Sequence, residues 1–322
     1  MQNKKIVILG TGGTIAGTAS PASVEGSNIS YSAAQIGVDQ LVGAIPVLAR
    51  SGNITSEQVA QIDSKDMTFA LWSHLAERVQ HHLAQSDVQG IVITHGTDTI
   101  EETAYFLQAV LSPSKPVVLT CAMRPATALA PDGPQNVLDA VAVARHAGAT
   151  GVVVVCAGSV HSAVDVQKLH SYHLNAFSSG DAGPIAYVEE NNLRILRNWP
   201  ESQQIQARAA IESIAFLKHI KSWPKVEIVL NYAGANGELI DALVTSGVRG
   251  LVVAGTGNGT IHHALEAALL KAQAQGVYIV RSTRCAQGRV LPKADDLFPT
   301  FDGLSPVKSR IALMLQLMNI KA

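Results

Sequence analysis

The chain has 322 residues, of which 47% are hydrophobic and 15% are charged, and its formal net charge at pH 7 is -1. This length and composition allow a large buried core, which excludes an intrinsically disordered protein. The nearly balanced charge, without a run of lysine or arginine, predicts that nucleic acid is not a partner. No segment approaches the ~18 continuous apolar residues of a membrane-spanning helix, so we predict no membrane association.

The cysteines and the first residues predict where the protein works. Cys121, Cys156 and Cys285 are far apart and odd in number, which is typical of buried thiols in a reducing compartment. The two N-terminal lysines precede too short an apolar run, ended by Gly10, to form a secretory signal. We therefore predict a cytoplasmic protein, with prior removal of a leader peptide as the alternative.

The first half of the chain alternates apolar runs with helical patterns. Runs rich in valine and isoleucine predict strands covered by helices on both faces, as in a parallel sheet. The predicted strands are 6–9, 90–94, 117–121 and 151–156. Apolar residues at every fourth position, acidic residues near a start and a proline at a first turn predict three helices. These helices are 67–86, 98–111 and 134–147.

The second half repeats this alternation after a looser stretch. Residues 157–198 form short alternating pieces, and 201–221 lack strand character. Strands at 226–230, 251–254 and 277–280 and helices at 260–275 and 308–318 follow. This order predicts an α/β fold of two doubly wound units, the larger one first. We place the domains at 1–200 and 225–322, with a linker at 201–224.

The first predicted strand leads into a glycine-rich loop, VILGTGGTIAG at residues 7–17. A dinucleotide-binding loop needs G-x-G-x-x-G/A, and here Ile15 occupies the third position, where its branched side chain would obstruct strand–helix packing. No acidic residue closes a second strand about 20 residues later, and no phosphate-binding G-x-x-x-x-G-K-[ST] is present. The loop is therefore interpreted as one that presents Thr14, with a purely structural turn as the alternative.

A second loop lies in IVITHGTDTIEETAYF, residues 91–106. The predicted strand delivers Thr97 and Asp98 to its carboxyl end, where open α/β sheets bind ligands. Taken alone, Asp98 would be interpreted as the cap of the following helix. Two threonine loops at the ends of two strands indicate instead a catalytic hydroxyl beside a carboxylate.

TGGTIAG (11–17) and HGTDTIEETAYFL (95–107) closely resemble the bacterial asparaginase and glutaminase-asparaginase family. The resemblance continues through KPVVLTCAMRP (115–125), DVQK (165–168) and AGTGNGT (254–260). It implies a larger N-terminal domain with a mainly parallel sheet and a smaller, flavodoxin-like C-terminal domain. It also implies hydrolysis of L-asparagine through a threonine acyl-enzyme, without a metal or organic cofactor. The implied assembly is a homotetramer, a dimer of intimate dimers whose active sites lie between subunits.

The resemblance also implies roles for particular residues. Thr14 would be the nucleophile, and Tyr31 would lie in the loop that closes over the substrate. Thr97, Asp98 and Lys168 would form a second catalytic group. The implied substrate-binding residues are Gly13, Ser64, Lys65, Gly96, Ala122 and, from the neighbouring subunit, Asn258.

General chemistry agrees with this set of residues. Amide hydrolysis needs a nucleophile, a proton acceptor and donors that face the developing oxyanion. The β-methyl group of threonine restricts its χ1 angle and can hold the hydroxyl at a defined bearing. A lysine accepts a proton only if its pKa is lowered; burial would lower the pKa of Lys168 and the charge of Asp98 would raise it. The sequence does not decide which effect is larger.

Lys65 departs from the family, which usually has glutamine or glutamate there to hold the α-ammonium group of the substrate. A lysine within roughly 4 Å of an ammonium group costs about 4 kcal/mol at an effective dielectric of ~20. Lys65 must therefore turn to solvent, pair with Asp63 or Asp66, or meet a second carboxylate on the substrate. The alternative substrates are L-glutamine, D-asparagine or an amide without a free α-amino group.

Three further expectations complete the interpretation. The histidines include no H-E-x-x-H pattern, so we predict no metal site. Asp295 or Asp296 is expected to be the acidic residue that the neighbouring subunit supplies. A regulator that binds a nucleotide or amino acid without chemistry is the alternative from another functional class.

Overall fold

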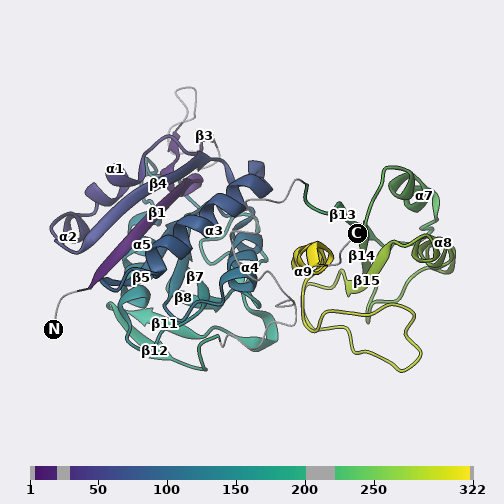
Figure 1. Ribbon diagram of the computed structural model, residues 1–322. Helices are drawn as coiled ribbons and strands as arrows, with labels where there is room; N and C mark the ends of the chain where they lie inside the picture. Colours follow the sequence, from purple (N-terminus) through teal and green to yellow (C-terminus); the bar gives the residue numbers. More distant parts are fainter. Residues whose placement is uncertain (1–3, 20–29, 201–221, 320–322) are drawn as a thin grey trace. The chain divides into compact units, whose positions relative to one another are not determined.

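The structure is a computed structural model that describes residues 4–19, 30–200 and 222–319 (Figure 1). The chain divides into two compact units, Met1–Gln204 and Ile205–Ala322. Most of the predicted linker, 201–224, lies outside the described residues. None of the helices in the described ranges combines the length and apolar character needed to cross a membrane.

An eight-stranded sheet forms the centre of the N-terminal unit, in the order β12-β11-β8-β7-β6-β5-β1-β4. The five strands from β4 to β7 are parallel. They are β4 (Ile54–Ile62), β1 (Lys5–Gly12), β5 (Val88–Thr94), β6 (Val117–Thr120) and β7 (Val152–Cys156). Antiparallel strands β8 (Ser159–Ser162), β11 (Ala186–Glu189) and β12 (Asn192–Ile195) extend the sheet. Strands β6 and β7 are buried along their whole length, which explains their continuous apolar sequence.

Helices cover both faces of the parallel part of this sheet (Figure 1). On one face α1 (Val38–Gly43), α2 (Pro46–Ala49) and α5 (Gly133–Arg145) enclose a core with alternate residues of β1. On the other face α3 (Phe69–Leu83) and α4 (Ile100–Leu111) pack together, and Trp72 stacks on Phe106 at 5.0 Å. Alternation of β1 side chains between two helix-covered faces makes every one of its apolar residues a core residue.

Short elements follow the strands at the carboxyl edge of the sheet. Single-turn helices η1 (Thr14–Ala16) and η2 (Ser64–Asp66) come after β1 and β4. Strand pairs β2 (Thr18–Ala19) with β3 (Tyr31–Ser32), and β9 (Gln167–Lys168) with β10 (Phe177–Ser178), are antiparallel. A third single turn, η3 (Gly180–Ala182), precedes β11. Five of the predicted site residues lie on these pieces: Thr14, Tyr31, Ser64, Lys65 and Lys168.

The C-terminal unit is built on three parallel strands, β13 (Val226–Leu230), β14 (Gly250–Gly255) and β15 (Tyr278–Thr283), in that order. Helices α7 (Glu238–Thr245), α8 (His263–Ala274) and α9 (Pro306–Asn319) accompany them. Leu251 and Val253 of β14 share a core with Leu265 and Leu269 of α8. The predicted fold class is confirmed: a large, mainly parallel sheet and a separate, smaller domain with a parallel sheet.

The predicted helix starts differ from the structure by one to three residues: the helices expected from residues 67, 98, 134, 260 and 308 begin at Phe69, Ile100, Gly133, His263 and Pro306. The helix expected from residue 98 begins at Ile100, and Thr99 precedes it, because the Asp98 carboxylate binds Lys168 and the Asp98 N–H binds Ser64. The helix expected from residue 260 begins at His263, because Thr260 is paired with Thr256 in a β-bridge. Strand β4 and helices α1, α2 and α7 were not predicted.

Glu57 on β4 is the centre of a polar cluster with helix α3. Its carboxylate accepts two hydrogen bonds from Arg78, at 2.6 and 3.0 Å, and lies 2.7 Å from Nε2 of His82. The Arg78 hydrogen bond is the largest influence and, with His82, lowers the pKa of Glu57 to about 2, against the opposing effect of burial.

We expect Glu57→Gln to lower the apparent free energy of unfolding at pH 7 by about 1–2 kcal/mol. A pKa lowered in the folded state stabilises the protein above the unfolded value of 4.5, and this contribution is lost as the pH falls toward 2. Urea unfolding at pH 7 and pH 3, at one protein concentration, should show the difference from wild type shrinking at the lower pH. Glu189→Gln, which removes an exposed pair with Arg194, is the control; a Glu57 effect no larger than this control contradicts the prediction.

Candidate active site

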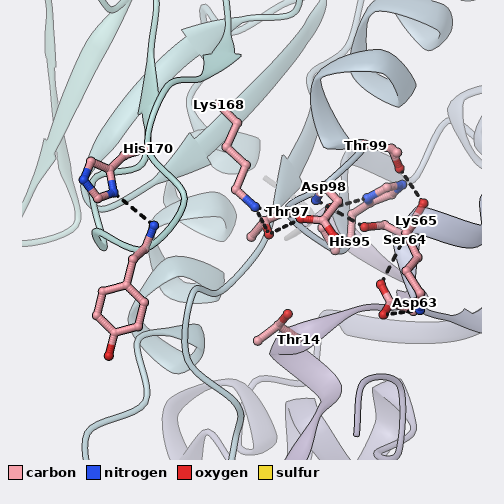
Figure 2. A network of polar contacts seen from close by, with 12 residues as sticks. Thr14, Asp63, Ser64, Lys65, His95, Thr97, Asp98, Thr99, Lys168 and His170 are labelled. Carbon is pink, nitrogen blue, oxygen red and sulfur yellow. Dashed lines mark hydrogen bonds and ion pairs between the residues drawn. The ribbon is translucent and has the colours of Figure 1, made fainter. Parts of the chain in front are cut away.

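The site forms where the strand order reverses. The chain starts at β1, adds β4 on one side and then β5, β6 and β7 on the other. At such a switch point the loops after adjacent strands diverge and leave a crevice at the carboxyl edge of the sheet. The loops after β1, β4, β5 and β6 carry Thr14, Ser64, Thr97 and Ala122, respectively. Figure 2 shows the first three of these side chains converging.

Thr14 begins the turn η1 and is 7% exposed. Its hydroxyl lies 2.7 Å from the hydroxyl of Tyr31 on β3. Gly12 and Gly13 before it have φ angles of 103° and 81°, which favour glycine strongly. The two glycines therefore allow the chain to turn sharply out of β1 and present the threonine at the sheet edge.

The glycines also bring three loops into close contact. A Cβ atom added to Gly13 would lie 2.4 Å from Cα of Gly96, in the loop after β5. A Cβ atom added to Gly96 would lie 2.4 Å from Oγ of Ser64, in the loop after β4. No side chain fits at either glycine, so both predicted substrate-site glycines are required by packing alone.

Lys168 joins Thr97 to Asp98 (Figure 2). Its Nζ donates to Thr97 Oγ1 and to Asp98 Oδ1, both at 2.8 Å. The β9–β10 pair carries Lys168 to the end of β5, 70 residues away in the sequence from Asp98. The predicted second group of hydroxyl, carboxylate and lysine is therefore assembled, although its catalytic role stays a prediction.

Ser64 is buried and connects the loop after β4 to the loop after β5. Its hydroxyl oxygen accepts from the Asp98 N–H at 3.2 Å, and its carbonyl accepts from the Thr99 hydroxyl at 2.8 Å. The Ser64 hydroxyl proton remains able to donate to an anionic group. This is compatible with the predicted contact to a substrate carboxylate.

Lys65 turns toward solvent and pairs with both neighbouring carboxylates. Its Nζ lies 2.7 Å from Asp63 and 3.3 Å from Asp66, and its side chain is 62% exposed. The hydrogen bonds that Lys65 donates to Asp63 and, to a smaller extent, to Asp66 raise the pKa of Lys65, which therefore stays charged. Two of the three arrangements expected from the sequence occur together.

The side chains of Asn136 and Asp132 fix the backbone of the loop after β6 by hydrogen bonds. Asn136 donates to the carbonyl of Cys121 at 2.9 Å, and Asp132 accepts from the N–H groups of Met123 and Arg124, also at 2.9 Å. Ala122 between them is fully buried, and within the described ranges its carbonyl has no donor. Asp132 and Asn136 were not predicted as site residues, and no spacing pattern in the sequence indicated them.

Asn258 and the acidic candidates lie in the C-terminal unit. The Asn258 amide binds the carbonyl of Leu291 at 3.0 Å and its N–H at 2.7 Å. Asp296 is bonded to Arg281 and to the N–H of Lys293, whereas no described residue is bonded to the Asp295 carboxylate. These contacts of Asn258 lie within the C-terminal unit, and its role toward a neighbouring subunit stays a prediction.

Comparison with known proteins identifies the family. Residues 5–201 match the family model described as asparaginase, N-terminal, and residues 225–321 match the glutaminase/asparaginase C-terminal domain. The chain belongs to the asparaginase family. The predicted resemblance is thereby confirmed, and the protein is a hydrolase of that family.

Individual asparaginase relatives match nearly the whole chain. L-asparaginase 2 of Bacillus subtilis is 37% identical over 97% of this chain and 82% of that protein. A glutaminase-asparaginase of Pseudomonas fluorescens is 38% identical over 97% of this chain and 86% of that protein. The crystal structure of a probable cytoplasmic L-asparaginase from Campylobacter jejuni superposes with a TM-score of 0.89 at 36% identity, covering 98% of this chain and 96% of that chain.

Two further features of this asparaginase-family site are a buried histidine, His95, and the lack of a metal-binding cluster among the described residues. His95, quoted in the sequence motif without a role, is completely buried, and burial lowers its pKa to about 4. Among the described residues, no three histidine, cysteine, aspartate or glutamate side chains are grouped so that they could hold a metal ion.

Proposed function

We propose that this asparaginase-family protein hydrolyses L-asparagine to L-aspartate and ammonia through an acyl-enzyme on Thr14. One observation carries the proposal: two threonine hydroxyls lie on glycine loops that contact each other, and each is hydrogen-bonded to a different titratable side chain. Thr14 has Tyr31 at 2.7 Å, and Thr97 has Lys168 at 2.8 Å. Relatives named L-asparaginase support the choice of substrate.

In the first half of the reaction, the Thr14 oxygen attacks the side-chain amide carbon. Tyr31 accepts the Thr14 proton and passes its own proton to the amide nitrogen, so the phenol ends neutral. The C–N bond breaks, ammonia leaves, and an ester joins the substrate to Thr14. The two hydroxyls are already within hydrogen-bond distance of each other, and such pre-positioning favours this transfer because less reorganisation is needed to reach the transition state.

Backbone groups of the same loops are available to stabilise the transition state. The N–H groups of Thr14 and Thr97 donate to no acceptor in the part of the chain that the structure describes. They can receive the negative charge that develops on the carbonyl oxygen, a contribution of about 100- to 1,000-fold in kcat per donor. The carbonyl of Ala122 can accept a hydrogen bond from the amide nitrogen.

In the second half, water attacks the ester carbon. Thr97 and Lys168 orient this water. As the ester C–O bond breaks, Tyr31 gives its proton to the Thr14 oxygen and accepts the proton that the water loses, so that both hydroxyls end neutral. L-aspartate is released and the enzyme returns to its starting state. Asp98 holds Lys168 beside the Thr97 hydroxyl, since the same Nζ contacts both side chains.

Ammonia release at neutral pH tests the proposed function. The four substrates are L-asparagine, D-asparagine, L-glutamine and succinamic acid, which lacks the α-amino group. A preference for L-asparagine supports the proposal, and a preference for another of the four supports the alternative substrates. Thermal shift by NAD or ATP without ammonia release from any amide would instead support a binding regulator.

The alternative, the same chemistry on another amide, is motivated by Lys65. The pairing of Lys65 with Asp63 and Asp66 supports L-asparagine, because two carboxylates offset the lysine charge that would repel an α-ammonium group. The relatives named glutaminase-asparaginase support L-glutamine as a second substrate.

We expect Lys65→Gln to change kcat/KM for L-asparagine by less than about threefold, because exposed ion pairs contribute little. If Lys65 faced the substrate instead, removal of a like charge at ~4 Å would raise kcat/KM by about 1,000-fold. Steady-state kinetics with L-asparagine and succinamic acid measure the difference. Lys115→Gln, at the opposite edge of the sheet, is the control; a rise confined to Lys65→Gln and to L-asparagine contradicts the prediction.

We also propose a homotetramer of two intimate dimers, in which Asn258 serves the active site of a neighbouring subunit. Its support is the family membership and the placement of Asn258 in the C-terminal unit, where its contacts lie within that unit. Sedimentation analysis tests the assembly. Co-refolded Thr14→Ala and Asn258→Ala chains should recover part of the activity that each lacks alone, since mixed dimers contain one intact site.

The proposed location is the cytoplasm. Similarity to the probable cytoplasmic protein of Campylobacter jejuni supports it, although a Haemophilus influenzae relative is named a probable periplasmic L-asparaginase. Fractionation of cells that express the native gene tests this location.

A further inference from the structure

His95 is the one buried titratable side chain in the loop after β5, and the mechanism above does not use it. Its ring is completely buried, and Nδ1 lies 2.8 Å from the carbonyl oxygen of the next residue, Gly96. A carbonyl oxygen can only accept, so Nδ1 carries the proton and Nε2 carries a lone pair. Nε2 is buried and has no hydrogen-bond partner in the described parts of the chain.

This hydrogen bond sets the orientation of the Gly96–Thr97 peptide. No described peptide bond is cis, so the Thr97 N–H points opposite to the Gly96 carbonyl and away from the buried ring. The next N–H, that of Asp98, is occupied by Ser64, whereas the Thr97 N–H has no acceptor among the residues described. Gly96 has no side chain to restrict its backbone, and its Cα packs against Gly13.

We propose that His95 is a positioning residue that holds the Gly96 carbonyl inward, so that the Thr97 N–H stays directed at the developing negative charge of the substrate carbonyl. The inference rests on the proposed hydrolysis, and it adds a fully buried side chain that acts through the backbone of the loop after β5. Burial lowers the pKa of His95 to about 4, and the ring therefore stays neutral with one donor at the working pH.

The unpaired Nε2 is the second observation that points to this function. An apolar side chain at this position would avoid leaving a polar atom in the core without a partner. The position keeps a donor at Nδ1 at the expense of an unsatisfied acceptor at Nε2. We therefore expect that a substitution of His95 that lowers kcat more lowers the unfolding temperature less.

The test compares His95→Asn with His95→Leu, two side chains of nearly equal size. The Asn Nδ2 atom occupies the place of Nδ1 and can donate to the Gly96 carbonyl, whereas leucine cannot. We expect the Leu variant to lose roughly 10- to 100-fold in kcat with little change in KM, because the interaction acts in the transition state. The Asn variant should keep kcat within about threefold of wild type. His146→Leu, which removes another histidine with an unpartnered Nδ1 at the far edge of the sheet, should keep wild-type kcat.

Thermal unfolding and crystal structures of the two variants complete the test. The Leu variant should unfold at a temperature equal to or above that of the Asn variant, while its Gly96–Thr97 peptide is rotated or disordered. Equal kcat in the Asn and Leu variants, or an unchanged peptide in the Leu variant, would overturn the inference. Absence of activity in the wild type overturns the proposed function instead, and the structures of the variants still decide whether His95 orients the peptide.

Discussion

Thr14→Ala is expected to lower kcat for L-asparagine by about four to six orders of magnitude, the scale seen when a catalytic nucleophile is removed. The reason is that Thr14 supplies the attacking oxygen and, among the described residues, is the hydroxyl that is hydrogen-bonded to Tyr31. Circular dichroism should show an intact fold, because within the described residues the lost hydroxyl makes one hydrogen bond, and the glycine turn before it is unchanged. A coupled ammonia assay on the purified variant measures the loss.

Thr14→Ser is the matched control for this experiment. It keeps the nucleophilic oxygen and loses only the methyl group that restricts χ1, so we expect it to retain far more activity than the alanine variant. Mass spectrometry of quenched reactions should detect an acyl adduct on wild type and Thr14→Ser. An alanine variant with more than a tenth of the wild-type kcat would refute Thr14 as the nucleophile.

Thr97→Val is expected to lower kcat by about 100- to 10,000-fold, the range of general acid–base contributions. Valine keeps the shape of threonine but breaks the 2.8 Å hydrogen bond to Lys168. Because this pair acts on the water of the second half, the variant should release about one equivalent of ammonia rapidly and then stall as the acyl-enzyme. Rapid-quench measurement of ammonia and aspartate separates the two steps.

Lys168→Met should show the same burst, since it removes the other member of the pair. Thr245→Val changes an exposed threonine whose hydroxyl donates to the carbonyl of Asp241 in its own helix, α7, and it should leave both rates unchanged. If Thr97→Val slows the first release of ammonia as much as the release of aspartate, the assignment of Thr97 to the second half is wrong.

The central strands could be predicted from the sequence, because strands covered on both faces must be apolar throughout. The predicted segments 117–121 and 151–156 differ from β6 and β7 by one residue each. Strand β4 could not be predicted in this way, since it lies at the edge of the sheet and its sequence, ITSEQVAQI, mixes polar and apolar residues. Its polar residue Glu57 is hydrogen-bonded to Arg78 and His82 of α3. These residues are more than 20 positions away, so the local sequence around β4 does not indicate the contact.

The candidate site was predictable only in part. Thr14 and Thr97 follow apolar strands directly, so their position at the carboxyl edge follows from the strand pattern. Lys168 is different: it lies in a short hairpin far from Thr97 in the sequence, and the family resemblance, not a spacing rule, indicated it. The roles of Asn136 and His95 depend on contacts with the backbone of other loops, which a sequence does not display.

The sequence by itself determined the fold class, the family and the two loops that carry threonine, because periodicity and glycine turns are local properties. Only the tertiary structure decided which hydrogen bonds and ion pairs the side chains of the site make. It turns Lys65 to Asp63 and Asp66, and it gives the Asp98 carboxylate to Lys168 rather than to a helix start. These choices depend on distances between loops that follow different strands, and strand order sets those distances only once the whole sheet has formed.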